Sequence, residues 1–138
     1  MIPIDSVASL WNTSVEFDVL KGKTITSIEG MEVGSTQIQF NCSDGYSYIM
    51  GHAFTNVEPV EVQVDDICGE VDSLIGSPIV IAEENYNEDG EPKNTSDKSW
   101  LWVFYKFATI KGYVDIKWYG VSDGRYSEAV EMYKVSRA

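Results

Sequence analysis

Apolar and polar residues alternate along most of this chain, and the dominant period is two. The alternation is clearest in "TQIQF" (36–40), "VEVQV" (60–64) and "YVDIKWYG" (113–120). Successive side chains of a β-strand point to opposite faces, so this pattern is typical of half-buried antiparallel strands. The segment "PIVIA" (78–82) is instead a continuous apolar run, which predicts a strand covered on both faces.

Glycine-containing turns separate these segments at regular intervals and set the expected element boundaries. The pattern predicts eight strands, near 23–29, 35–41, 46–53, 60–66, 78–85, 99–109, 112–120 and 127–135. A short helix is expected from Asp5 to Trp11, and Asp72 is placed to cap one further helical turn. We therefore expect one domain over 1–138 that is mainly β: a compact antiparallel sheet, a sandwich or an open barrel of about eight strands. The polar stretch 84–99 is predicted to be a mobile loop.

The segment 99–128 concentrates the aromatic residues and holds four of the ten Lys and Arg residues. On a strand over 100–109, Trp100, Trp102 and Phe104 share one face, and the residues between them form a second apolar face. A hairpin that is apolar on both sides indicates a central element of a sandwich or barrel. Two other interpretations stay open: an aromatic platform for stacked bases, or a buried hairpin whose polar end "GVSDGRYSE" (120–128) lines a pocket.

Charge is the strongest compositional signal. The formal net charge is −12, and no Lys or Arg occurs between Thr24 and Pro92, where fourteen acidic residues lie. Such a surface can serve solubility alone, or it can attract a basic groove of a partner protein. It disfavours direct binding to duplex DNA, which needs clustered cations. The candidate protein-binding residues are Glu58, Glu61, Asp65, Asp66, Glu83 and Glu84.

The sequence carries no recognisable catalytic or metal-binding motif. His52, Cys42 and Cys68 are the only soft ligands, too few for a closed zinc site. The stretch "NYNEDGEPKNTS" (85–96) resembles a calcium loop only at its start and ends in Ser rather than Glu. We therefore expect no enzyme, no metal and no cofactor. Neither a membrane span nor a secretory signal is recognisable, so we expect a cytoplasmic protein with reduced thiols.

Three blocks resemble an uncharacterised family of small proteins encoded mainly by bacteriophages and prophages: "VLKGKTITSIEG" (19–30), "DICGEVDSLIGSPIVIAEE" (66–84) and "WVFYKFATIKGYVDIKWYGVSDGRYSE" (102–128). The resemblance implies a phage accessory protein that works in the cytoplasm of the infected bacterial host. It supplies no established activity. Relatives often carry an acid- and thiol-rich stretch where this chain reads "GHAFTNVEP" (51–59), which keeps only His52 and so weakens any metal or redox role.

Three classes of function follow from these features. The first is a non-enzymatic anti-defence or host-takeover factor, an acidic inhibitor that binds a host nucleic-acid-binding protein through its basic surface. The second is a small-molecule module that sequesters a nucleotide signal. The third is a self-associating structural or assembly protein, a homodimer through an exposed strand edge. The candidate ligand-binding residues of the second class are His52, Lys106, Lys117, Tyr119, Ser122, Asp123, Arg125, Tyr126, Ser127 and Glu128.

Overall fold

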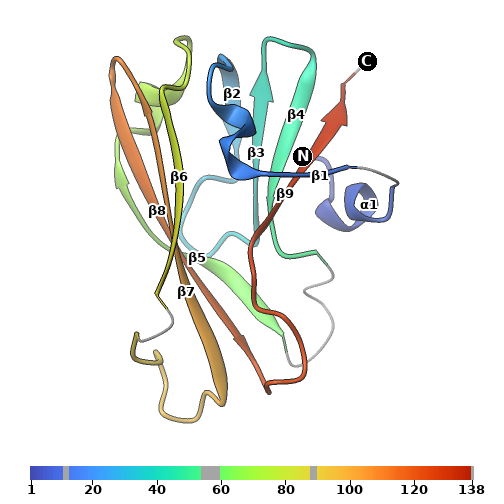
Figure 1. The fold of residues 1–138 in the computed structure, drawn as a ribbon, viewed down its shortest axis with the longest axis vertical. Coiled ribbons are helices and arrows are strands. Elements are labelled where there is room, and N and C mark those ends of the chain that lie inside the picture. Colours follow the sequence, from blue (N-terminus) through green and yellow to red (C-terminus); the bar gives the residue numbers. More distant parts are fainter. Residues whose placement is uncertain (11–12, 54–59, 88–89, 138) are drawn as a thin grey trace.

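The computed structural model describes residues 1–10, 13–53, 60–87 and 90–137, and it has two antiparallel β-sheets packed face to face (Figure 1). One sheet has the strand order β1-β9-β4-β3-β2 and the other the order β5-β8-β7-β6. The strands are Ser14–Val15 (β1), Ile25–Glu29 (β2), Gln37–Cys42 (β3), Tyr46–Gly51 (β4), Glu61–Gly69 (β5), Ile81–Asn87 (β6), Ser99–Thr109 (β7), Gly112–Ser122 (β8) and Glu131–Ser136 (β9). The mainly β fold expected from the alternation is confirmed, and it is a sandwich rather than a closed barrel.

The hydrophobic core lies between the two sheets and follows the predicted alternation. The four-stranded sheet contributes inward residues such as Val103, Tyr105 and Trp118, and the five-stranded sheet contributes Phe40 and Met50 among others. Trp118 is fully buried, with 0% of its surface exposed. Burial of these large apolar side chains is the main driving force for bringing the sheets together.

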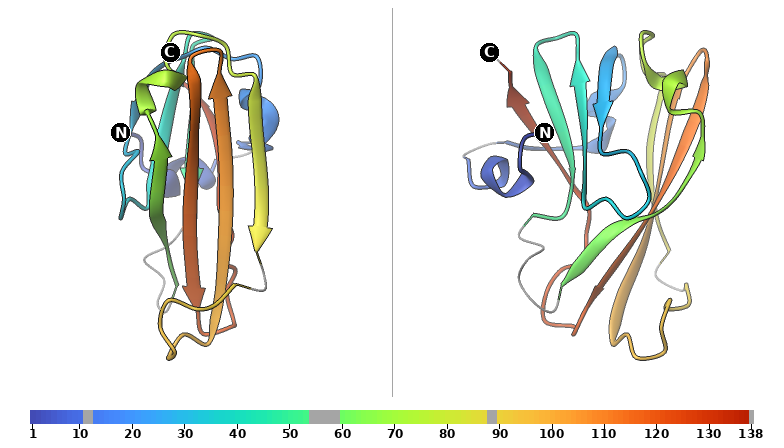
Figure 2. Two further views of the ribbon diagram at one scale, coloured as in Figure 1. Left: turned by 90° about the vertical axis from the view of Figure 1, so that its left-hand side faces the viewer. Right: turned by 180° about the vertical axis from the view of Figure 1, so that it is seen from behind.

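The hairpin β7–β8 occupies the centre of the four-stranded sheet, as the two-faced apolar pattern indicated. Its strands pair without interruption from Ser99 opposite Ser122 to Thr109 opposite Gly112. Figure 2 (left) shows this sheet from its outer side, with β8 and β7 between the edge strands β5 and β6.

Several local expectations were wrong. The run 78–82 is not covered on both faces: β6 begins only at Ile81, and Val80 is 46% exposed. The preceding residues instead form isolated bridges to the β2 region, for example Pro78 with Thr24, where the chain passes from β5 to β6, the two edge strands of the same sheet.

The helical segments also differ from the expectation. The N-terminal helix α1 (Ile4–Ala8) is shorter than predicted, and its N-cap residue is Pro3, with no side-chain cap. Asp72 lies inside the 3₁₀ turn η2 (Val71–Leu74), whose N-cap is Glu70. The sequence pattern missed strand β1 and the 3₁₀ turn η1 (Phe17–Leu20), because elements of two and four residues show no period.

The outer face of the five-stranded sheet is closed by the N-terminal segment. The side chain of Gln37 accepts a hydrogen bond from the Ile4 amide at 3.0 Å and donates one to the Ile2 carbonyl at 2.7 Å, and Gln39 accepts from the Ile2 amide at 2.7 Å. Helix α1 then packs Ile4 and Val7 into a second, smaller hydrophobic cluster on this face. Among the described residues, no such helix covers the outer face of the four-stranded sheet (Figure 1).

Candidate functional site

The outer face of the four-stranded sheet carries the residues that point away from the core. The strand register sets them in three rows across β5, β8, β7 and β6. The rows are Gln63–Tyr119–Trp102–Asn87, Asp66–Lys117–Phe104–Asn85 and Cys68–Asp115–Lys106–Glu83. Aromatic and charged side chains therefore share one surface, which we call the outer face.

The loop over residues 90–98 covers the first of these rows. The indole N–H groups of Trp100 and Trp102 donate to the carbonyl oxygens of Gly90 and Glu91, each at 2.7 Å. Trp102 consequently is only 9% exposed although it points away from the core. The expected loop at 84–99 thus begins later than predicted, because residues 84–87 extend β6.

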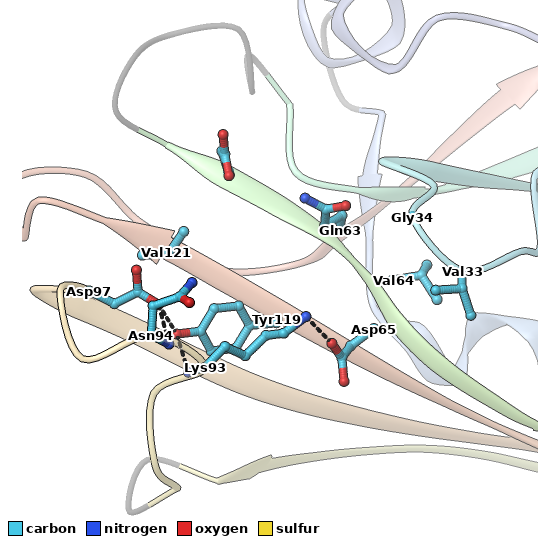
Figure 3. Close-up of a pocket in the computed structure, with 11 residues that line it drawn as sticks. Val33, Gly34, Gln63, Val64, Asp65, Lys93, Asn94, Asp97, Tyr119 and Val121 are labelled. Carbon is cyan, nitrogen blue, oxygen red and sulfur yellow. Dashed lines mark hydrogen bonds and ion pairs between the residues drawn. The ribbon is translucent and has the colours of Figure 1, made fainter.

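Tyr119 and Lys93 fasten the same loop to the strands (Figure 3). The Tyr119 hydroxyl donates to Asp97 at 2.5 Å and accepts from the Lys93 amide at 3.1 Å. The Lys93 ammonium pairs with Asp65 at 2.5 Å and lies 5.8 Å from the centre of the Tyr119 ring. Burial, reinforced by the bond to Asp97, raises the pKa of Tyr119 to about 12.

The other two rows are not covered by this loop. They border a cavity of about 320 Å³ whose lining includes Asp66, Phe104, Lys106 and Asp115. Figure 2 (left) shows that the loop lies at one end of the sheet and that no other described segment crosses the middle of the strands on this side. We call this open part of the outer face, with Phe104 near its centre, the Phe104 groove.

A β-bulge changes the expected arrangement of Asp65 and Asp66. Neighbouring residues of a regular strand point to opposite faces, which predicts that these two carboxylates are separated. The register shifts between Val64 and Asp66, so that Asp66 pairs with Lys117 while Asp65 forms an ion pair with the same Lys117 at 3.8 Å. The extra residue of the bulge thus turns the Asp65 carboxylate toward Lys117, while Asp66 is its register partner without an ion pair.

The candidate acidic residues divide into two groups by what they contact. Asp65 is held by Lys93 and Lys117, and Glu84 faces inward and accepts a 2.7 Å hydrogen bond from the Tyr105 hydroxyl. The other three, Glu61, Asp66 and Glu83, are exposed and form no ion pair within the described part of the chain. Glu58 lies outside the described residues.

The cations, in contrast, are largely engaged within the molecule. Ion pairs hold some of them to carboxylates, and aromatic rings or backbone carbonyls hold the others. Eight of the ten are engaged in this way: Lys23, Lys93, Lys106, Lys111, Lys117, Lys134, Arg125 and Arg137. Most of the cations thus have a partner among the described residues, whereas Glu61, Asp66 and Glu83 form no ion pair there.

The candidate ligand-binding residues do not converge on one cavity. Lys106 and Lys117 border the Phe104 groove, and Tyr119 lines a separate cavity with Asp65 and Lys93. Ser122 and Asp123 line a third cavity beside Glu61. His52, Tyr126 and Ser127 meet in a fourth cavity of about 370 Å³ near α1 and β9.

Arg125 is occupied by its neighbour in the turn. Its guanidinium pairs with Asp123 at 2.5 Å, and its Nε donates to the same carboxylate at 2.7 Å. The bond lowers the pKa of Asp123 below its usual value. Arg125 is 72% exposed and lies 5.8 Å from the Tyr126 ring, so its contacts are those of a surface turn.

Glu128 and His52 also have structural partners. Glu128 accepts hydrogen bonds from the hydroxyls of Ser99 and Ser122, the latter at 2.9 Å, and so ties the segment before β9 to the β7–β8 hairpin. The Nδ1 of His52 lies 2.6 Å from the Ala129 carbonyl oxygen and 4.0 Å from a carboxylate oxygen of Glu131. Neither arrangement provides a nucleophile together with its base.

Phe104, Asp115 and Asn85 belong to the outer face but were not among the candidate residues. The alternation in 113–120 placed Asp115 and Lys117 on one face, which was the available signal for the former. Phe104 was assigned to an apolar face without a sequence signal that this face stays open. Within the described part of the chain no group of three His, Cys, Asp or Glu side chains could hold a metal ion. None of the described helices has the length and apolar character needed to cross a membrane.

Residues 18–132 match the family model described as "Domain of unknown function (DUF7448)", and the chain therefore belongs to this family. No curated protein and no solved structure matches it.

Proposed function

We propose that this DUF7448 domain is a non-enzymatic binding protein whose acidic surface engages the basic surface of a partner. The observation that carries the proposal is that most cations have partners within the described part of the chain, while several exposed carboxylates have none there. Most cations contact a carboxylate, an aromatic ring or a carbonyl of the same chain, whereas Glu61, Asp66 and Glu83 are exposed on the edge strands β5 and β6 and form no ion pair with a described residue. Exposed carboxylates with no internal counterion attract and orient a cationic partner.

The partner class that fits is a nucleic-acid-binding protein of a bacterial host. Proteins of this class present clustered Lys and Arg to phosphates, and an acidic domain can occupy that cluster in place of the nucleic acid. The resemblance of the sequence blocks to phage-encoded proteins supports a role as an accessory inhibitor in the infected cell's cytoplasm. A net charge of −12 is in keeping with this role and opposes contact of the domain itself with DNA.

Binding of an anionic nucleotide is the weaker alternative. It requires free cations around an aromatic ring, yet Arg125 is paired with Asp123, and Lys117 is paired with Asp65 and lies 4.5 Å from the Trp102 ring. The purified protein tests this alternative directly. Release of a nucleotide on denaturation, together with loss of that nucleotide in the Arg125→Ala variant, would favour it over the acidic inhibitor.

The test of the proposal uses a charge-neutralised variant, with Glu61→Gln, Asp66→Asn and Glu83→Gln combined. We leave Asp65 and Glu84 intact because both hold internal contacts. The matched control neutralises Asp18, Glu32 and Asp72, which are exposed and lie outside the four-stranded sheet. Both variants lose three charges, so a difference between them reports position rather than net charge.

The immobilised protein is exposed to nuclease-treated bacterial lysate, and bound proteins are identified after elution with salt. We expect nucleic-acid-binding proteins that are released between about 0.1 and 0.5 M salt, because screening shortens the range of charge interactions. The neutralised variant is expected to lose them and the control to keep them. Added duplex DNA is expected to compete with the domain. Equal retention by both variants, or partners without basic surfaces, would contradict the proposal.

A further inference from the structure

The two parts of the outer face differ in what covers them. The loop over 90–98 closes the end around Trp102 and Tyr119, and it makes hydrogen bonds to both side chains. The Phe104 groove lies on the same two central strands, and its residues also point away from the core. One sheet face thus shows a covered part and an open part with similar side-chain chemistry.

The covered part shows how this face recognises a segment of polypeptide. The segment that lies on it is polar, and its backbone supplies the carbonyl oxygens of Gly90 and Glu91 to two indole N–H groups. Its basic side chain, Lys93, reaches a carboxylate while lying over an aromatic ring. A carboxylate beside an aromatic face suits a cationic side chain, because the charge and the ring quadrupole both attract it.

The Phe104 groove contains the same combination, without an occupant from the described chain. Phe104 is half-buried, and the diagonal neighbours on the adjoining strands are Asp115 of β8 and Glu83 of β6. Neither carboxylate forms an ion pair with another described residue. Both border the same cavity as Phe104.

The ammonium groups of the two groove lysines lie near other aromatic rings, those of Trp102 and Tyr113. The Lys117 ammonium lies 4.5 Å from the Trp102 ring centre and 6.0 Å from that of Phe104, on the side of the covered part. The Lys106 ammonium lies 4.8 Å from the Tyr113 ring centre, toward the tip of the hairpin. The carboxylates of Asp115 and Glu83 therefore border the space over Phe104 together with Lys117, whose ammonium is nearer to the Trp102 ring.

We propose that the Phe104 groove docks an extended segment of the partner protein through an arginine side chain. The guanidinium stacks on Phe104 and pairs with Asp115 and Glu83, and the segment follows the groove as the loop over 90–98 follows the covered part. Arginine fits better than lysine because its planar group can stack on a ring and bond two carboxylates at once. This inference rests on the proposed function, since it gives the acidic domain a defined contact for a basic partner.

The test is an NMR titration of the intact protein with the acetylated, amidated peptide Gly-Arg-Gly-Arg-Gly. The same peptide with citrulline in place of arginine is the matched probe, because it keeps the shape and loses the charge. We expect the arginine peptide to shift the amide signals of Asn85, Phe104, Lys106, Asp115 and Lys117. We expect the citrulline peptide to leave them nearly unchanged.

Two variants locate the contact. The pair Glu83→Gln with Asp115→Asn is expected to weaken peptide binding about three- to fivefold, and Phe104→Leu by a similar factor. The pair Asp18→Asn with Asp72→Asn removes the same charge outside the groove and is expected to have little effect. The melting temperature of each variant shows whether it is folded. If Phe104→Leu is unstable, the pair Glu83→Gln with Asp115→Asn still tests the contact.

Equal binding of the citrulline peptide, or equal losses in the two charge pairs with shifts spread over the whole acidic surface, would overturn the inference. The results also separate it from the proposed function. A basic partner whose binding is unaffected by the groove variants but depends on Glu61 would leave the proposed function standing and contradict the groove inference. A peptide that binds at Phe104 while no basic partner is captured from lysate would support the groove inference and contradict the proposed function.

Discussion

The two faces of the β7–β8 hairpin both carry large aromatic side chains, but they meet different surroundings. The inward face, with Val103, Tyr105 and Trp118, packs against the opposite sheet and is buried throughout. The outward face, with Trp102, Phe104 and Tyr119, is covered only at one end, and by a polar loop rather than by a sheet. The comparison shows that apolar residues on a strand face predict burial of that face. They do not predict whether another sheet, a loop or a partner protein buries it.

The two tyrosines of these faces make the difference concrete. Tyr105 and Tyr119 each donate a hydrogen bond to a carboxylate, Glu84 at 2.7 Å and Asp97 at 2.5 Å. Burial raises the pKa of both phenols, and the carboxylates add to the effect. The rise is larger for Tyr105, which lies between the sheets, than for Tyr119, which lies under the loop.

The largest effect is expected for the inward face. Trp118→Ala removes a fully buried indole from between the sheets, and a large cavity in a packed core costs about 3–5 kcal/mol of unfolding free energy. Urea unfolding followed by circular dichroism measures the loss. Trp118→Phe is the control and is expected to lose less, because it fills part of the space. An alanine variant as stable as the wild type would show that the inward face is not core.

A smaller effect is expected for the outward face. Trp102→Ala removes an indole of similar size, but the loop above it is polar and close to water. We expect a loss of about 2 kcal/mol, near the value for moving one large apolar side chain out of water. The loop over 90–98 is also expected to become more sensitive to protease, since the bond to the Glu91 carbonyl is lost. A loss as large as that of Trp118→Ala would remove the distinction between the two faces.

The sequence predicted the sheets better than it predicted their surroundings. Alternation placed Val114, Ile116 and Trp118 on one face because the period of a strand is a local property. The contact of Lys93 with Asp65 joins residues 28 positions apart and leaves no periodic trace. The same holds for the N-terminal segment, which covers the five-stranded sheet through side chains of β3.

The candidate site was only partly predictable for the same reason. Composition indicated an acidic surface, but the bulge at Asp65 and the inward direction of Glu84 decide which carboxylates stay available. The sequence favoured a surface ion pair of Arg125 with Asp123 or Glu128 over a ligand contact, and the turn brings it to Asp123. The position of Phe104 in an open groove depends on where the loop stops, which no strand pattern records.

A third prediction concerns Tyr119 and its pH dependence. Tyr119→Phe removes the hydrogen bonds to Asp97 and to the Lys93 amide, and we expect a loss of about 1 kcal/mol at neutral pH. The folded state raises the pKa of this phenol from about 10 to about 12, so its contribution is complete below pH 10 and declines as the pH rises toward 12. The stability difference between wild type and variant should therefore shrink over that range. Tyr113→Phe, at an exposed position, is the control. A difference that grows with pH would contradict the assignment.

The smallest effect is expected for the ion pair that fastens the loop. Lys93→Met removes the ammonium group from Asp65 and from the Tyr119 ring, but about half of the Lys93 side chain is exposed, so solvent screens the interaction. We expect a loss below about 1 kcal/mol at low salt that largely disappears in 1 M NaCl, where charges are screened within about 3 Å. Lys98→Met in the same loop is the matched control, since Lys98 makes no ion pair with the described residues. Denaturant unfolding of both variants at the two salt concentrations measures the difference. A salt-independent loss of several kcal/mol would mean that Lys93 stabilises the loop by packing rather than by charge. The covered part would then give no support to the docking of a basic side chain in the Phe104 groove.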